Sequence, residues 1–177
     1  EMCIRDREDS VYQALEEGNI PAEKLAKIKS DTIELFVENG LDREEAKKIL
    51  DVYNKNLLIN ATKGIQYLHE TYELLKQAFR DVCNQGPLAK EPCSKIKVKV
   101  VDAELHEDAI HRGPAQVIPA VRYAIREAMI NSSPKILEPV QIIRVDVPEE
   151  LIGEAMNEIQ NRRGQVQNVE TCLLYTS

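Results

Sequence analysis

The order of hydrophobic patterns in the middle of the chain constrains the fold more than any other feature. Residues 57–59 form a short apolar run, which predicts a buried strand. Over residues 65–82 the apolar positions recur at spacings of three and four, which is typical of one side of a helix packed on a sheet. Gly86 and Pro87 end this helix. The first predicted unit is therefore a strand followed by a covering helix.

A second strand and a second helix follow. Residues 95–101 alternate apolar side chains with lysines, which predicts a half-buried strand with an outer face of Lys95, Lys97 and Lys99. A helix is predicted from Gln116, with Pro119 in its first turn, where the missing N–H costs little. Its inward residues are Val117, Ile118, Val121 and Ile125. We therefore expect an α+β fold with a β-α-β core.

A helical segment is predicted ahead of this core. A helix over residues 8–17 ends at Gly18, and a second helix runs from Pro21 to Gly40. Asp42 and Glu45 form a capping box for a third helix that reaches about residue 53. Its inward residues are Ala46, Ile49, Leu50 and Tyr53. These helices form either a solvated cover or a protein-docking face.

Residues 134–139 indicate a domain boundary. An apolar strand is predicted over residues 140–147, and Pro148 then opens a helix whose inward residues are Ile152, Ala155, Met156 and Ile159. Gly164 ends this helix, and a strand over residues 165–169 follows. This order starts a small α+β unit that would need further strands to complete its sheet.

The terminal segments do not read as native protein. Residues 1–7 and 172–177 resemble translated sequencing-adapter DNA, so we expect a native segment over about residues 8–171. The four cysteines include no closely spaced pair, which favours reduced thiols over a zinc site or a disulfide. The composition, 43% apolar and 30% charged, is that of a soluble globular protein, and no run is long enough to span a membrane.

The charge balance limits how the chain could bind nucleic acid. A net charge of −7 argues against a surface that coats RNA, because phosphate contacts need clustered lysine and arginine. Any RNA contact must then be local. The lysines at positions 95, 97 and 99 are one candidate, although such a row is more often a solvated sheet surface.

A histidine-rich run over residues 106–114 is the main candidate site. His106 and His111 are five positions apart, whereas the zinc-protease motif places its histidines four apart on one helical face. His69 lies on a distant predicted helix, so no third metal ligand is apparent. The chain also has no nucleophile elbow and no glycine-rich phosphate loop, so we assign it no catalytic residue and no metal. On spacing alone, His111 reads as an ordinary turn residue.

Three stretches carry a resemblance to a known family. They are residues 60–68 (NATKGIQYL), residues 86–89 (GPLA) with 105–116 (LHEDAIHRGPAQ), and residues 137–140 (LEPV) with 162–166 (RRGQV). In sequence, order and spacing they resemble the elongation factor 2 family of translational GTPases. The run Gly113-Pro114-Ala115-Gln116 is similar to the archaeal form, because the eukaryotic form has a glycine run there.

The resemblance implies a domain organisation and a site. Residues 8–137 would form most of the family's domain IV, with a ribosomal-protein-like two-layer sandwich, and residues 138–171 would start a truncated ferredoxin-like domain V. His111 would be the histidine converted to diphthamide. The tip that enters the decoding site would comprise Asp108, His111, Arg112, Gly113 and Gln116.

The resemblance also implies partners. The full-length parent would be a cytoplasmic, monomeric GTPase that uses GTP and Mg²⁺, whereas this chain would hold no cofactor. Its partners would be the small-subunit decoding site of the ribosome, tRNA, mRNA and the diphthamide-synthesis enzymes, and ADP-ribosylating toxins would act on the modified histidine. Two alternatives stay open at this point: a non-enzymatic RNA-binding module of similar fold, and a metal-dependent enzyme.

Overall fold

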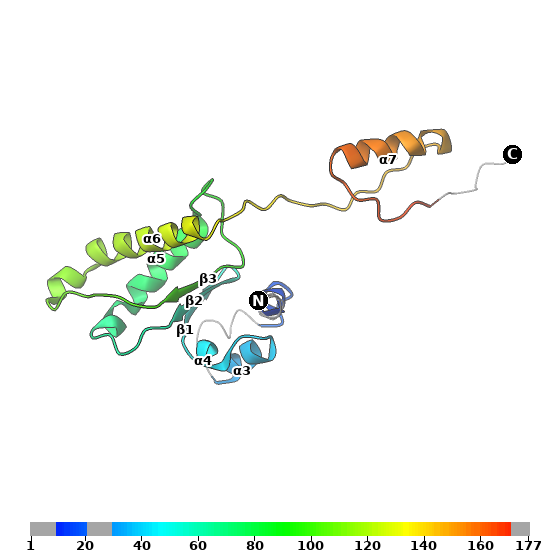
Figure 1. The fold of residues 1–177 in the computed structure, drawn as a ribbon. Helices are drawn as coiled ribbons and strands as arrows, with labels where there is room; N and C mark the ends of the chain where they lie inside the picture. Colours follow the sequence, from blue (N-terminus) through cyan, green and yellow to red (C-terminus); the bar gives the residue numbers. More distant parts are fainter. Residues whose placement is uncertain (1–9, 21–29, 171–177) are drawn as a thin grey trace. The chain divides into compact units, whose positions relative to one another are not determined.

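The computed structural model describes residues 10–20 and 30–170, which divide into two compact units between Ile136 and Leu137. The first unit holds a three-stranded sheet in the order β1-β2-β3 (Figure 1). Its elements are a helix over residues 10–16, α3 (Ser30–Glu38), α4 (Arg43–Ala46), β1 (Ile49–Tyr53), β2 (Asn56–Asn60), η1 (Leu68–Thr71), α5 (Tyr72–Asn84), β3 (Lys97–Val100), η2 (Ala109–Arg112) and α6 (Pro114–Asn131). The mixed α+β class is confirmed.

Strands β1 and β2 form an antiparallel hairpin that the sequence analysis did not predict. Tyr53 pairs with Asn56 across a two-residue turn, and the central residues Asn54 and Lys55 have φ values of 46° and 63°. Positive φ at both positions belongs to the turn type whose twist matches that of paired strands. The run at residues 57–59 was predicted as a buried strand, and β2 confirms it.

The predicted third helix was wrong beyond its first turn. The Asp42 side chain caps α4 as expected, accepting from the backbone N–H groups of Glu44 (2.9 Å) and Glu45 (3.2 Å). The helix nevertheless ends at Ala46, and the residues expected to complete it form β1 instead. A bulge between Ile49 and Asp51 breaks the alternation of side chains between the two faces of this strand. Apolar residues at helix-like spacings can therefore also occur in β1.

Helices α5 and α6 cover one face of the sheet (Figure 1). Strand β2 pairs with β3 in parallel, and α5 makes the crossover between them, as parallel pairing requires. The predicted helix over residues 65–82 is present from Tyr72 onward, with the short turn η1 before it. The core on this face contains Leu58, Leu68, Leu75, Phe79, Val82, Cys83 and Ile125.

The opposite face is covered by the N-terminal helical segments, so the sheet is buried on both sides. The helix over residues 10–16 was predicted, and Gly18 follows it with a φ of 74°. The predicted second helix is present as α3, while its expected start at Pro21 lies outside the described residues. The core on this face contains Val11, Tyr12, Ala14, Ile20, Phe36, Leu41, Ala46, Ile49, Leu57 and Ile59.

Helix α6 begins two residues earlier than predicted. Pro114 occupies the start of the helix, so Pro119 lies inside the helix rather than in its first turn. Pro119 is exposed, on the side of α6 that faces away from the core. The predicted inward face is confirmed: Val117, Ile118 and Ile125 are buried, and Val121 packs against the core.

The second unit contains one α-helix among its described residues. This helix is α7 (Ile152–Asn161), and the short helix η3 (Glu149–Leu151) precedes it. The four residues of α7 that were predicted to face inward are partly buried. The predicted strands over residues 140–147 and 165–169 do not form, and their large apolar side chains are exposed. A strand needs a hydrogen-bonded neighbour, and the described residues 137–170 supply none. The adapter-like ends, 1–7 and 172–177, lie outside the described residues.

Candidate functional site

The candidate site is the end of the first unit where several loops meet. Strands β2 and β3 are parallel, so their carboxyl ends lie together, and the chain turns there into α5 and α6 (Figure 1). The segment between β3 and α6 carries the histidine run. We call residues 106–113 the histidine turn.

His111 is exposed on the short helix η2 within this turn. Asp108 organises the turn: its carboxylate accepts from the N–H of Ile110 (3.1 Å), and its carbonyl accepts from the N–H of His111 (3.1 Å). These bonds satisfy backbone donors at the start of η2 that would otherwise have no partner within the helix. The turn therefore presents the imidazole of His111 to solvent.

The two histidines of the turn are in contact. The His106 and His111 ring centroids are 4.6 Å apart with their planes inclined by 68°. His106 Nδ1 accepts from the N–H of Asp108 (3.0 Å), which fixes the orientation of its ring. The two rings, five positions apart in the sequence, can meet because residues 106–111 do not form an α-helix.

The ring contact does not amount to a metal centre. Among the described residues, no three histidine, cysteine, aspartate or glutamate side chains converge where a metal ion could sit. His69 lies on η1 and is exposed. Nor do the thiols assemble with these histidines: Cys83 and Cys93 are free and lie at the other end of α5.

Arg112 is held within the protein rather than exposed at the tip. One guanidinium nitrogen donates to the carbonyls of His106 (2.7 Å) and Glu107 (2.5 Å), and the other pairs with Glu70 (2.8 Å). The guanidinium carbon lies 4.1 Å from the centre of the Tyr67 ring. The side chain is only 8% exposed. Arg112, which was predicted as a tip residue, is thus held by contacts within the first unit.

The remaining predicted tip residues lie where the turn enters α6. The carbonyl of Gly113 accepts from the N–H groups of Gln116 (3.1 Å) and Val117 (3.0 Å), so Gly113 is the N-cap of the helix. Gln116 is exposed on the first turn of α6. The structure thus places Asp108, His111, Gly113 and Gln116 together at one surface.

The three lysines of the predicted basic row, of which Lys97 and Lys99 lie on β3 and Lys95 lies ahead of it, pair with acidic residues of the N-terminal helical layer. Lys97 and Lys99 both pair with Glu45 of α4, the former at 3.3 Å. Lys95 pairs with Glu16 at 3.3 Å. Lys97 is mostly buried, whereas the side chains of Lys95 and Lys99 are 44% and 38% exposed. A contact of these lysines with RNA therefore stays a prediction.

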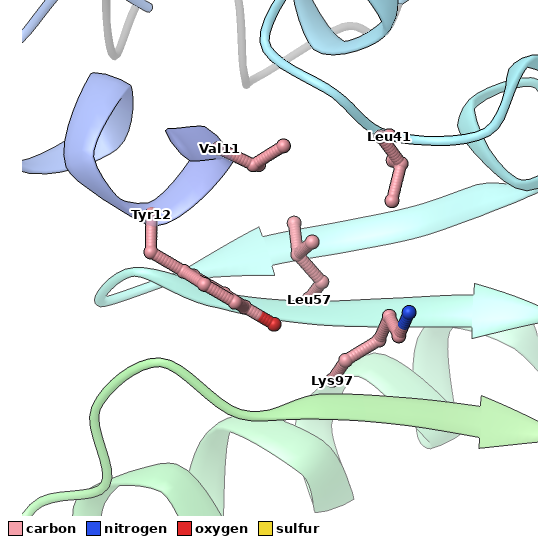
Figure 2. A pocket seen from close by; sticks show the side chains of 5 residues that line it. All are labelled: Val11, Tyr12, Leu41, Leu57 and Lys97. Carbon is pink, nitrogen blue, oxygen red and sulfur yellow. The ribbon is translucent and has the colours of Figure 1, made fainter. Parts of the chain in front are cut away.

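A shallow recess lies on the same side of the sheet. Figure 2 shows its lining residues, Val11, Tyr12, Leu41, Leu57 and Lys97. The recess is a seam between the N-terminal layer and the sheet, and it has no room for a water molecule. The candidate site is therefore the histidine turn rather than this recess.

Tyr67 and Glu70 were missed by the sequence analysis as residues of the site. Both precede α5, more than forty positions away from Arg112 in the sequence, and neither belongs to a spacing pattern that marks a contact with it. The available signal was the presence of Tyr67 in the first of the three resembling stretches.

Comparison with known proteins agrees with the fold and with the motifs. Residues 20–133 match the family model of elongation factor G, domain IV, and residues 135–172 match that of the elongation factor G C-terminus. No helix within the described ranges, 10–20 and 30–170, is long and apolar enough to cross a membrane.

Curated archaeal proteins are similar over nearly the whole chain. Elongation factor 2 of Methanocaldococcus jannaschii is 48% identical over 168 residues, which is 94% of this chain and 23% of that protein. Elongation factor 2 of Thermoplasma acidophilum is 50% identical over 160 residues, which is 90% of this chain and 22% of that protein. The chain thus spans less than a quarter of the length of these relatives. With the family model covering most of its length, the chain belongs to the elongation factor G domain IV family and is similar there to archaeal elongation factor 2.

Proposed function

We propose that this chain supplies the part of a translation elongation factor that reaches the ribosomal decoding site during translocation of tRNA and mRNA. The single observation that carries the proposal is the exposure of His111 on a turn braced by Asp108 and Arg112. An exposed side chain on a fixed backbone can contact another molecule without first reordering its own loop, which reduces the entropic cost of binding.

His111 is the proposed site of diphthamide formation. Its ring is open to solvent and packs against one neighbouring ring, that of His106. A modifying enzyme can therefore reach it, and a long substituent finds room outside the turn. The resemblance in sequence around His111 supports the same assignment.

The charge of the turn gives the modification a physical role. The exposed residues Asp102, Glu104, Glu107 and Asp108 are acidic, and the guanidinium of Arg112 is engaged inside the protein. The cationic arm of diphthamide would supply the positive charge that approaches phosphate or sugar. A chain with a net charge of −7 can thus contact RNA through one point, which would steady the tRNA–mRNA duplex and maintain the reading frame.

The properties of the parent protein are part of the proposal. The relatives named elongation factor 2 are about four times the length of this chain. We propose that the parent is a cytoplasmic, monomeric GTPase that uses GTP and Mg²⁺ outside this segment. Its partners would be the ribosome, the diphthamide-synthesis enzymes and ADP-ribosylating toxins.

Replacement of His111 in the full-length factor tests the proposal. His111→Gln should abolish the added mass on the peptide that contains this residue, and it should raise frameshifting on a reporter mRNA. His69→Gln is the matched control, because it removes another exposed histidine outside the turn. Unchanged frame maintenance in His111→Gln would argue for the alternative of a general RNA-binding module.

A further inference from the structure

We propose that Tyr67 and Glu70 are positioning residues, which hold Arg112 as an internal cross-link and thereby fix the backbone that presents His111. The inference deepens the proposed function and rests on it for its biological meaning. Its structural content can be tested separately. We call Tyr67, Glu70 and Arg112 the Arg112 cluster.

The contacts of Arg112 connect two loops. Its guanidinium donates to two successive carbonyls of the histidine turn, those of His106 and Glu107. It also pairs with the carboxylate of Glu70, which lies on η1 ahead of α5. The cross-link therefore ties the start of the histidine turn to its end and to the neighbouring loop. Charge-assisted bonds of this kind are stronger than neutral ones.

Tyr67 completes the cluster through an unusual backbone conformation. Its φ is 64°, in the left-handed region that non-glycine residues rarely occupy, and bulky residues least of all. In this conformation its ring lies against the guanidinium, 4.1 Å from ring centre to guanidinium carbon. Strain of this kind persists where surrounding contacts over-determine it. The stacked arginine is such a contact.

A lysine could not replace this arginine. Arg112 Nε is buried and has no hydrogen-bond partner among the described residues, so the group is held by its other nitrogens and by the ring face. A planar guanidinium can donate in two directions and stack at the same time, whereas an ammonium group is a point charge. The site thus selects the shape of the guanidinium as well as its charge.

Two roles for Arg112 can be distinguished. If Arg112 contacted phosphate, loss of its charge would weaken binding to RNA. Loss of Glu70 would not weaken that binding, because the Glu70 carboxylate only neutralises the arginine. If it acts as a cross-link, loss of Glu70 or of the Tyr67 ring should reproduce loss of Arg112. The 8% exposure of the Arg112 side chain favours the second role.

Amide hydrogen exchange in the full-length factor measures the cross-link directly. The amides of Asp108, Ile110 and His111 are bonded within the turn, so exchange of peptides over residues 106–113 reports its opening. Glu70→Gln, Arg112→Lys and Tyr67→Asn should each accelerate that exchange about tenfold, the effect expected from loss of one charge-assisted contact. Tyr67→Phe keeps the ring and should retain slow exchange.

A double-mutant cycle tests whether Glu70 acts through Arg112. The Glu70→Gln/Arg112→Lys double variant should exchange no faster than Arg112→Lys alone, because the contact that Glu70→Gln removes is already lost with the guanidinium. Glu73→Gln is the matched control: it removes an exposed carboxylate, three residues further on, that pairs with Lys76 at 2.7 Å. Thermal unfolding monitored by circular dichroism identifies any variant whose faster exchange reflects global unfolding.

The outcomes separate this inference from the proposed function. Unchanged exchange in Glu70→Gln and Tyr67→Asn overturns the positioning role, and so does additive acceleration in the double variant. Faster exchange together with raised frameshifting and reduced modification of His111 supports both. Faster exchange with normal frame maintenance keeps the cross-link and overturns the proposed function of the turn.

Discussion

Arg80 on α5 and Asp51 on β1 form a two-bonded ion pair across the interior of the first unit. Arg80 Nε donates to one carboxylate oxygen of Asp51 at 2.7 Å, and a terminal nitrogen donates to the other at 2.9 Å. The carboxylate is buried, while the arginine is about half exposed. The bulge in β1 allows this contact, since it turns Leu50 and Asp51 toward the same helix-covered face.

The Asp51–Arg80 pair should be worth more than a surface ion pair. Arg80→Ala leaves a buried carboxylate without its partner, and we expect it to lower the free energy of unfolding by about 1–3 kcal/mol. Urea unfolding of the chain measures the change. Arg80→Lys keeps the charge but loses the paired geometry, so it should fall between wild type and Arg80→Ala. A cost no larger than that of Glu73→Gln would contradict this expectation.

The contact between α4 and β3 should make stability depend on acid. Burial raises the pKa of Glu45, but the hydrogen bond from Lys99 and the charges of Lys97 and Lys99 outweigh burial and hold the pKa below its ordinary value of 4.5. A carboxylate whose pKa is lowered by folding stabilises the fold at pH values above its unfolded-state pKa. This contribution is lost as the pH falls through the folded-state pKa. We therefore expect Glu45→Gln to cost about 0.5–1 kcal/mol at neutral pH.

The pH dependence distinguishes this effect from a general loss of packing. Below pH 4.5 the difference in unfolding free energy between wild type and Glu45→Gln should shrink, because Glu45 itself becomes protonated there. Urea titrations at neutral pH and at pH 3 measure it. Glu38→Gln serves as the control, since Glu38 is exposed on the same helical layer. If the difference in unfolding free energy between wild type and Glu45→Gln did not change with pH, the cost would come from altered packing rather than from the lost charge.

Cys83 should resist alkylation in the folded chain. Burial raises the pKa of its thiol to about 12, from an ordinary value of 9.0. The reactive thiolate is therefore much scarcer near neutral pH than in an exposed cysteine. Iodoacetamide labelling followed by peptide mass spectrometry should find Cys83 slow in native conditions and fast in urea. Cys93 is the internal comparison, because burial also raises its pKa but the residue is less buried.

Two glycines should differ in how well they tolerate alanine. A Cβ at Gly86 would stand 2.8 Å from the carbonyl oxygen of Glu91 and 3.1 Å from Cys93 Sγ. Gly86→Ala should therefore cost about 1–3 kcal/mol of unfolding free energy through overpacking. At Gly113 the nearest atom is the flexible Gln116 Oε1 at 3.2 Å, so Gly113→Ala should stay within about 0.5 kcal/mol of wild type. Equal costs at both sites would contradict this account.

The sequence predicted those elements whose pattern has one physical meaning. The spacing along α5 and α6 indicates a helix packed on one side, and the apolar run at residues 57–59 is short enough to favour a buried strand. The segment from Arg43 to Tyr53 was ambiguous. Its apolar spacing suits a helix, but it also suits a bulged strand, and pairing with β2 decides the outcome. Pairing partners are tertiary information, which local periodicity does not contain.

The candidate site divides in the same way. Exposure of His111 follows from a turn signal and a capping aspartate, both of which are local. Arg112 is held by Glu70 and Tyr67. The lysines at positions 95, 97 and 99 are paired with Glu16 or Glu45. In each case the charge read from the sequence is neutralised by a residue distant along the chain. Counting charges near a motif therefore overstated the cations that this surface offers.

Because the sheet is buried on both faces, substitutions in the layer on one face can act independently of substitutions in the layer on the other. Strand β2 takes part in two hydrophobic cores, through Leu57 and Ile59 on one side and Leu58 on the other. The histidine turn is anchored to the side that contains α5 and α6. Substitutions in the outer layer of N-terminal helices should therefore leave the geometry around His111 unchanged.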